Sequence, residues 1–220
     1  MSKKIGLNLE EIKEKLSSSL LSDVLDAMGY RYQAMNEHLR PVYPGAVVVG
    51  MAHTMHMVDV HQHDIDTFPL QLKGIDALKK DDVMVVASNG SIQAALWGEL
   101  LSTAARIRGA RGAVIDGLAR DIRLIEEMKF PVFASGCRPI SSKGRVMAIS
   151  YGEKIKAGGV YVDSGDLIVG DVDGIIVVPK IAVDEAVKLA LERASKERVT
   201  RQELKAGSKL SDVYAKYGTI

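Results

Sequence analysis

The sequence has little of several features that define protein classes. Its 220 residues contain one cysteine, Cys137, so no disulfide can form within the chain, and we expect a reduced thiol acting as a small apolar filler. Neither charge sign is in excess: 29 Lys and Arg face 28 Asp and Glu. This balance removes the general electrostatic case for binding nucleic acid or a membrane surface, although a local basic face stays open.

Long apolar runs are also missing. The run 46–52 is far shorter than the roughly 18 residues that a membrane-spanning helix requires. Lys3 and Lys4 are followed by an amphipathic stretch, 9–16, where an export signal would need an unbroken apolar run. We therefore expect a soluble, cytoplasmic protein.

Enough apolar sequence is present to build one core. Apolar residues make up 47% of the chain and charged residues 26%, which excludes a disordered chain. There is no linker rich in Pro and Ser and no internal repeat. We expect one α/β domain over residues 1–220.

The first two thirds of the chain alternate between strand and helix patterns. The predicted strands are 46–52, 83–87, 113–115 and 132–134. The predicted helices are 22–28, capped by Ser22, 94–107 and 122–128. Such alternation predicts a parallel sheet.

The pattern changes after Gly144. Short runs rich in Val and Ile are separated by Gly and Asp turns, with no helix long enough to connect them in parallel, so we expect antiparallel or mixed pairing. The predicted strands there are 146–149, 159–162, 167–169 and 175–178. A long charged helix over 182–205 and a tail bearing aromatic residues follow.

Potential metal ligands gather in one segment, which contains His53, His56, Asp59, His61, His63, Asp64 and Asp66. On an extended segment His61 and His63 would present both rings on one face, as metal ligands sometimes do. A segment this polar is also typical of a solvated loop, and no third ligand at a diagnostic spacing occurs elsewhere. Structural or surface residues, substrate contacts and a metal site all remain open.

A second candidate site follows the strand that runs into Asp116-Gly117, where the next loop carries Arg120 beside Asp121. In an open α/β sheet, ligands collect outside the carboxyl ends of the strands. Arginine offers a planar fork for a carboxylate, and aspartate offers a hard oxygen ligand for Mg²⁺ or Mn²⁺. The pair therefore suits a metal-chelated 2-oxo acid. Spacing alone also allows a surface pair at a helix start, with Asp121 as the cap.

These residues end a longer pattern over 98–121, G-E-L-L-x-x-A-A-x-x-x-G-x-x-G-x-V-x-D-G-x-x-R-D, followed by F-P-V-F-A at 130–134. The pattern resembles the family that contains the regulator of ribonuclease E activity A (RraA) and the 4-hydroxy-4-methyl-2-oxoglutarate/4-carboxy-4-hydroxy-2-oxoadipate aldolases. The likeness extends to residues 22–26, 50–52, 165–169 and 171–175. It implies a swivelling β/β/α sandwich, a single RraA-like domain that assembles as homotrimers or homohexamers.

The aldolases of this family are marked by the Arg-Asp pair, so the resemblance favours a metal-dependent (class II) pyruvate aldolase with oxaloacetate decarboxylase activity. By similarity, Asp121 would bind Mg²⁺ or Mn²⁺, Arg120 would contact the oxygens of a small 2-oxo acid, and Glu99 would hold a metal-bound water. The residues that would bind the substrate are Gly98, Leu100, Leu101 and Arg120, with the backbone N–H groups of the two leucines receiving the pyruvyl carboxylate.

The resemblance also implies a contribution from a neighbouring subunit, whose C-terminal helix would complete the outer metal shell with a glutamate. Glu197 is the closest match, although Glu192 and Glu203 lie on the same helix. Two other functions stay open: a non-catalytic regulator of ribonuclease E, and a lyase or hydrolase for another, sugar-acid-like substrate on the same scaffold. The unusual segment from His53 to His63 could alter the choice of substrate.

Overall fold

Four parallel strands form the centre of the molecule. The computed structural model describes residues 8–61 and 65–218. The central strands are β2 (Val48–Asp59), β3 (Asp82–Ala87), β5 (Gly112–Ala119) and β6 (Val132–Cys137). β2 pairs with β3, β3 with β5 and β5 with β6, each in parallel. The predicted parallel sheet is confirmed, because each intervening segment returns the chain to the same edge.

Further strands widen this core into a nine-stranded sheet of order β1-β6-β5-β3-β2-β10-β11, in which β4 also pairs with β5 and β7 with β2. The added strands are β1 (Arg40–Pro41), β4 (Ala95–Trp97), β7 (Val146–Tyr151), β10 (Leu167–Gly170) and β11 (Ile175–Val178). A separate antiparallel hairpin consists of β8 (Ile155–Ala157) and β9 (Val160–Val162). β7, β10 and β11 all pair antiparallel with their neighbours, so the predicted change of pairing after Gly144 is confirmed.

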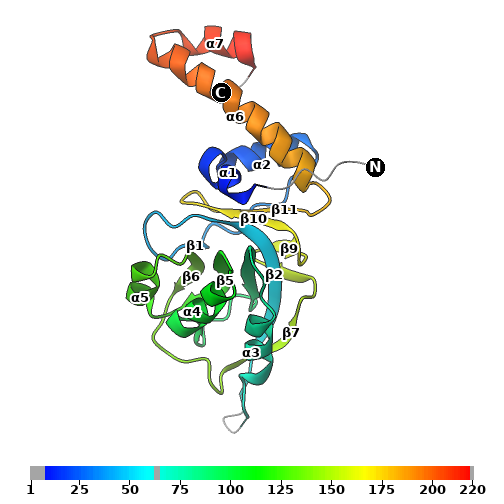
Figure 1. The fold of residues 1–220 in the computed structure, drawn as a ribbon, viewed down its shortest axis with the longest axis vertical. Coiled ribbons are helices and arrows are strands. Elements are labelled where there is room, and N and C mark those ends of the chain that lie inside the picture. The colour runs from blue at the N-terminus through cyan, green and yellow to red at the C-terminus, as the bar shows by residue number, and fades with distance from the viewer. Residues whose placement is uncertain (1–7, 62–64, 219–220) are drawn as a thin grey trace.

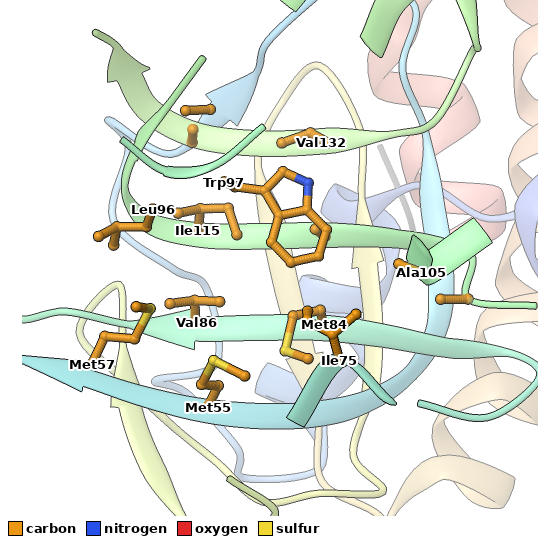
Figure 2. Packing of buried hydrophobic residues seen from close by; sticks show 14 of the residues in the cluster. Met55, Met57, Ile75, Met84, Val86, Leu96, Trp97, Ala105, Ile115 and Val132 are labelled. Carbon is orange, nitrogen blue, oxygen red and sulfur yellow. The ribbon is translucent and has the colours of Figure 1, made fainter. Parts of the chain in front are cut away.

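Helices cover the sheet in two groups (Figure 1). α3 (Pro69–Asp76), α4 (Glu99–Ile107) and α5 (Ile122–Glu127) pack on the central strands, whereas α1 (Leu9–Lys15), α2 (Ser18–Ala27) and α6 (Val183–Lys205) pack by β10 and β11. Figure 2 shows the core of the first group, where Trp97 lies among side chains such as Met84 and Ile115. This apolar layer holds the candidate site rigidly on the sheet.

Two predicted helices differ from the structure at their starts. Residues 95–97 form β4, and α4 begins only at Glu99, after Gly98 with an extended backbone at φ −155°. The four residues before Gly98 are all buried, and a short continuous apolar run fits a buried strand as well as a helix. α2 begins at Ser18 because the hydroxyl of Ser17, rather than that of Ser22, caps it by accepting a hydrogen bond from Leu20 N.

The C-terminal part forms a helical hairpin that projects from the sheet (Figure 1). The predicted helix over 182–205 is observed as α6, and the predicted tail instead contains a helix, α7 (Leu210–Tyr217). Glu203 of α6 accepts hydrogen bonds from Lys216 at 2.6 Å and from Tyr217 at 2.7 Å, which hold α7 against α6. Among the described residues, no helix has the length and apolar character needed to cross a membrane.

Candidate functional site

The turn after β5 places Arg120 and Asp121 at the carboxyl end of the parallel sheet. β5 ends at Ala119 and α5 begins at Ile122, so the chain reverses within two residues. Asp121 takes up this reversal with a left-handed backbone, φ 61° and ψ 33°. That conformation is costly for most residues, and aspartate and asparagine tolerate it best after glycine. The strained turn is therefore built around the residue with the proposed chemistry.

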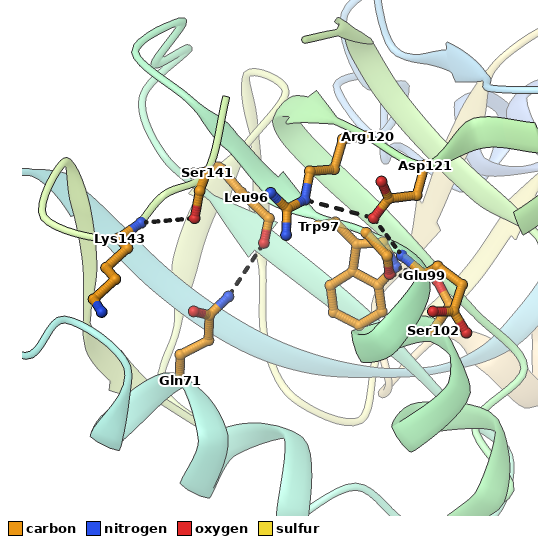
Figure 3. Close-up of polar contacts among 10 residues, drawn as sticks. Gln71, Leu96, Trp97, Glu99, Ser102, Arg120, Asp121, Ser141 and Lys143 are labelled. Atoms are coloured by element: carbon orange, nitrogen blue, oxygen red, sulfur yellow. Dashed lines mark hydrogen bonds and ion pairs between the residues drawn. The ribbon is translucent and has the colours of Figure 1, made fainter. Parts of the chain in front are cut away.

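The carboxylate of Asp121 points away from its own helix. It makes no capping hydrogen bond to α5. Its Oδ2 accepts a hydrogen bond from the backbone N of Glu99 at 3.3 Å and lies 3.5 Å from Nε of Arg120 (Figure 3). Asp121 occupies the N-cap position of α5, where its backbone O accepts a hydrogen bond from Ile125 N at 3.1 Å, but its side chain does not cap the helix, so that part of the alternative is wrong. The carboxylate instead lies between a guanidinium and the N-terminus of α4, which both carry positive potential.

The start of α4 leaves backbone donors available. The first intrahelical bond runs from Ser102 N to Gly98 O at 3.1 Å, so the helix itself does not use the amides of Leu100 and Leu101. The indole of Trp97 donates to Ser102 Oγ at 2.8 Å, and this hydroxyl donates to Gly98 O at 3.1 Å. These buried contacts fix the position of the helix start, where the dipole and free N–H groups favour an anion.

A cavity of about 240 Å³ lies beside this constellation. It is lined by Phe68, Gln71, Leu72, Ala95, Leu96, Trp97, Gly98, Leu100, Leu101, Arg120, Asp121, Ser141 and Ser142. The structure thus brings five of the sequence-predicted residues together: Gly98, Leu100, Leu101, Arg120 and Asp121. Residues from α3 and from the segment before β7 complete the walls, and no local motif of the sequence marks them.

Glu99 lies at the edge of this group. Its Oε1 accepts a hydrogen bond from Thr103 Oγ1 at 2.7 Å, one turn along α4, and its backbone N donates to Asp121. The side chain is partly exposed and does not line the cavity. The backbone of Glu99 thus contacts Asp121, the proposed metal ligand, and one oxygen of the Glu99 carboxylate is bound by Thr103.

The C-terminal glutamates lie outside the site of their own chain. Figure 1 shows α6 running away from the layer that contains α4 and α5. Glu197 is partly buried, and its Oε1 accepts a hydrogen bond from Nε of Arg193 at 3.2 Å. Glu203 is engaged by α7, and the bond from Lys216 holds the pKa of the Glu203 carboxyl below its ordinary value. The role expected for Glu197 therefore requires a second subunit.

The described histidines of the predicted segment do not line the cavity. His53 lies on β2 with its ring centroid 6.1 Å from that of Tyr151, and burial lowers the pKa of its imidazole. His56 follows on the same strand and His61 is exposed beyond it; none of the three lines the cavity. His63 and Asp64 lie outside the described residues. Within 8–61 and 65–218, no three His, Cys, Asp or Glu side chains gather closely enough to hold a metal ion.

Cys137 differs from its prediction as an apolar filler. It is exposed at the end of β6, and partial burial of the thiol raises its pKa. A raised thiol pKa disfavours the reactive thiolate.

The donor set at Asp121 fits a divalent cation that shares its coordination with substrate and water. Mg²⁺ typically binds one or two carboxylates, retains several waters and takes its remaining ligands from the substrate. The side chain of Asp121 is 39% exposed and borders the cavity, so such ligands can reach it. The residues present therefore fit Mg²⁺ or Mn²⁺ bound through Asp121.

The fold and the site together define a class of protein. It is an α/β protein in which an arginine, a carboxylate and a helix N-terminus converge on one small cavity, an arrangement suited to a small carboxylated molecule.

Comparison with known proteins identifies the family. The family model described as RraA-like, Aldolase/RraA, matches residues 18–177, which is well over half of the chain. The chain therefore belongs to the RraA-like family, and the resemblance inferred from the sequence is confirmed.

Solved structures agree with this assignment. A crystal structure of an uncharacterized protein from Pseudomonas syringae pv. tomato str. DC3000 has a TM-score of 0.81 and 28% identity, covering 93% of this chain and 95% of that chain. Streptomyces coelicolor RraAS2, described as an unusual member of the RNase ES inhibitor RraA protein family, has a TM-score of 0.80 and 26% identity, with coverages of 89% and 96%. The predicted RraA-like α/β fold is confirmed.

Sequence relatives include proteins named as aldolases. A protein of Halalkalibacterium halodurans named "Putative 4-hydroxy-4-methyl-2-oxoglutarate aldolase" is 30% identical over 165 residues, covering 75% of this chain and 73% of that protein. An uncharacterized protein of Methanocaldococcus jannaschii is 39% identical over 140 residues, 62% of this chain and 65% of that protein. Protein DlpA of Legionella pneumophila is 29% identical over 91% of this chain, which spans only 32% of DlpA.

Proposed function

We propose that the protein is a divalent-metal-dependent lyase that cleaves 4-hydroxy-4-methyl-2-oxoglutarate, or a related 4-hydroxy-2-oxo acid, to pyruvate and also decarboxylates oxaloacetate. The observation that carries the proposal is the position of Asp121. Its carboxylate makes no capping hydrogen bond to α5 and lies with Arg120 at the N-terminus of α4, beside the cavity. The name of the H. halodurans relative supports the same reaction class.

The cavity offers a separate group for each part of a 2-oxo acid. The amides of Leu100 and Leu101 receive the substrate carboxylate at the N-terminus of α4. Arg120 directs its guanidinium to the 2-oxo oxygen, on which negative charge grows as the bond breaks. A Mg²⁺ or Mn²⁺ held by Asp121 would supply Lewis-acid stabilisation of that charge. Asp121 and Arg120 thus act together on the oxygen that changes most in the transition state.

Cleavage breaks the bond between C3 and C4 of the substrate. The electron pair of this bond forms pyruvate enolate, while the 4-hydroxyl loses its proton and C4 becomes a carbonyl. Glu99, with Oε1 bonded to Thr103, uses its second oxygen to hold the water that accepts this proton. A proton returned to C3 gives pyruvate. In oxaloacetate the same C3–C4 bond breaks, CO₂ leaves, and the same enolate forms.

We extend the proposal to the assembly. The enzyme would be a cytoplasmic homotrimer or homohexamer in which Glu197 of a neighbouring subunit joins the metal site. This part rests on the family membership and on the distance of α6 from the site of its own chain.

A second candidate is a non-catalytic regulator of a ribonuclease, which the likeness to RraAS2 favours. Such a regulator would not need a carboxylate and a guanidinium held together beside a cavity. The Arg120–Asp121 pair therefore favours the lyase.

Pyruvate release separates the two candidates. The purified protein is given oxaloacetate or 4-hydroxy-4-methyl-2-oxoglutarate with Mg²⁺, with Mn²⁺ or with a chelator, and pyruvate is measured. We expect metal-dependent pyruvate from at least one substrate and its loss in Asp121→Asn. Asparagine keeps the shape and tolerates the left-handed backbone of this position, so the variant should fold normally. If neither substrate yields pyruvate at saturating metal, the proposed lyase activity is wrong. If Asp121→Asn keeps full activity, Asp121 is not the metal ligand.

A further inference from the structure

Gln71 is a buried polar residue in the wall of the cavity that the proposed chemistry does not use. It lies on α3 with 3% of its surface exposed, yet it lines the cavity together with Leu72 of the same helix and Phe68, the residue before it. A buried carboxamide is costly unless its polar atoms find partners. Filling space alone therefore does not explain a glutamine at this position.

The orientation of this carboxamide is fixed by one hydrogen bond. Nε2 of Gln71 donates to the backbone O of Leu96 at 3.1 Å (Figure 3). Because a carbonyl oxygen can only accept, the nitrogen must face Leu96 and the side-chain oxygen must face away from it. Among residues 8–61 and 65–218, no group donates to Oε1 of Gln71, and this atom is not sealed inside the protein. Gln71, which lines the cavity, therefore carries an oriented acceptor that has no partner among the described residues.

The surroundings make this acceptor selective. Leu96 and Trp97, both buried, give the cavity apolar walls, where a hydrogen bond is stronger than in water and an unsatisfied acceptor is more costly. Arg120 and the start of α4 supply the positive groups of the same cavity. A ligand that satisfies both sets carries a carboxylate at one end and a hydrogen-bond donor further along.

We propose that Gln71 is a specificity-determining residue whose Oε1 accepts a hydrogen bond from the 4-hydroxyl of the substrate. The inference rests on the proposed function of the same cavity and adds the chemical group that the α3 wall recognises. An amide oxygen is too weak a base to take the hydroxyl proton. The hydroxyl has a single hydrogen, which is donated to Gln71 in the bound substrate and turns to the water held by Glu99 before the C3–C4 bond breaks. The site thereby binds 4-hydroxy-2-oxo acids more tightly than 2-oxo acids that lack the hydroxyl.

Oxaloacetate supplies an internal control because it has no hydroxyl at C4. Gln71→Met keeps an unbranched chain of similar length and removes the acceptor. We expect KM for cleavage of 4-hydroxy-4-methyl-2-oxoglutarate to rise by roughly tenfold, the effect of losing one hydrogen bond, with no fall in kcat, because the bond is released before cleavage. KM and kcat for decarboxylation of oxaloacetate should stay within about twofold of wild type, because this reaction does not use the bond.

The ratio of the KM values for the two substrates distinguishes recognition from structural damage. Leu72→Ala is the matched control on the same helix and in the same cavity: it removes apolar surface and no polar group, so we expect it to leave the ratio near the wild-type value. An equal rise of KM for both substrates in Gln71→Met, or an unchanged KM for the 4-hydroxy acid, overturns the inference while leaving the lyase intact. If Gln71→Met does not fold, Gln71→Asn, which withdraws the acceptor by one methylene, must show the same selective rise in KM. Wild-type protein that releases no pyruvate from either substrate overturns the proposed function itself.

Discussion

At the scale of single residues, Gly98 determines where the carboxylate of Asp121 can lie. A Cβ atom added to Gly98 would lie 2.7 Å from Oδ2 of Asp121 and 3.1 Å from Cγ of Arg120. Its φ of −155° is open to any residue, so the requirement for glycine is steric. We predict that Gly98→Ala folds but loses about 10²-fold in pyruvate release, because a displacement near 1 Å is enough for such a loss.

A second glycine substitution provides the comparison for Gly98→Ala. Gly136 lies on β6 next to β5, and a Cβ there would meet only the flexible Cδ2 of Leu118, at 3.3 Å. Gly136→Ala should therefore keep most of the activity. The measurement is kcat/KM for oxaloacetate together with thermal unfolding of both variants. Equal activities for the two variants would show that Gly98 does not position the carboxylate.

The sequence predicts the part of the site that one continuous segment supplies. Arg120, Asp121 and the start of α4 fall within residues 98–121, so spacing and family resemblance both identify them. The orientation of Asp121 is not predictable in this way, because an aspartate before a helix serves equally as a cap, and only its left-handed backbone turns the side chain toward α4. Gln71 and Ser141 reach the cavity from distant segments, and their contact exists only after the strands have paired.

At the scale of elements, α3 shows why part of the fold is hidden from the sequence. The helix has eight residues, begins at Pro69 and contains Gly74, so its helical pattern is weak. A Cβ on Gly74 would collide with the side chain of Met55 and crowd that of Tyr151, so the same glycine lets α3 approach β7 closely and leaves room for Met55 of β2. The feature that weakens the sequence signal is thus the one that the packing requires.

The contact between β2 and the α3 layer also predicts a pH dependence. His53 lies there with Nε2 buried and, among the described residues, without a hydrogen-bond partner. Burial lowers the pKa of its imidazole from 6.5, so the unfolded chain binds a proton more readily than the folded protein. The contribution of His53 to stability is therefore complete above pH 6.5 and is lost as the pH falls below that value.

We predict that the free energy of unfolding falls less for His53→Phe than for the wild type as the pH is lowered below 6.5. One proton can contribute at most about 1.4 kcal/mol per pH unit to the slope. Urea unfolding at a series of pH values measures it. The urea unfolding curves of the two proteins at pH 7.5, where the imidazole is neutral in the folded and the unfolded state, give the difference in packing between the two side chains alone. Parallel curves for both proteins down to pH 5 would show that the protonation of His53 is not linked to folding.

At the scale of the whole molecule, the α6–α7 hairpin lies outside the part of the chain that lines the cavity. The family model matches residues 18–177 and ends before α6 begins, while the cavity lies wholly within the matched part. Within the hairpin, Lys216 and Tyr217 already bind the carboxylate of Glu203. Glu197 is held by Arg193, which also donates to Asp23 of α2, so this carboxylate is anchored at the base of the hairpin. Glu203 accepts two hydrogen bonds from α7, whereas Glu197 accepts one, from its own helix, so we test Glu197 as the group that reaches a neighbouring subunit.

A complementation experiment tests whether the site is shared between subunits. Asp121→Asn removes the proposed metal ligand, and Glu197→Gln removes the carboxylate offered to the neighbour, so each variant alone should have little activity. When both are refolded together at equal amounts, about one site in four combines an intact Asp121 with an intact neighbouring Glu197 in a head-to-tail ring, and activity should reappear. Mixing Asp121→Asn with Glu203→Gln gives the matched control: Glu203→Gln alone should stay active, because Glu203 serves only the contact with α7. If co-assembled Asp121→Asn and Glu197→Gln subunits recover nothing, each site is complete within one chain and the carboxylate that completes the metal site must come from the same subunit as Asp121.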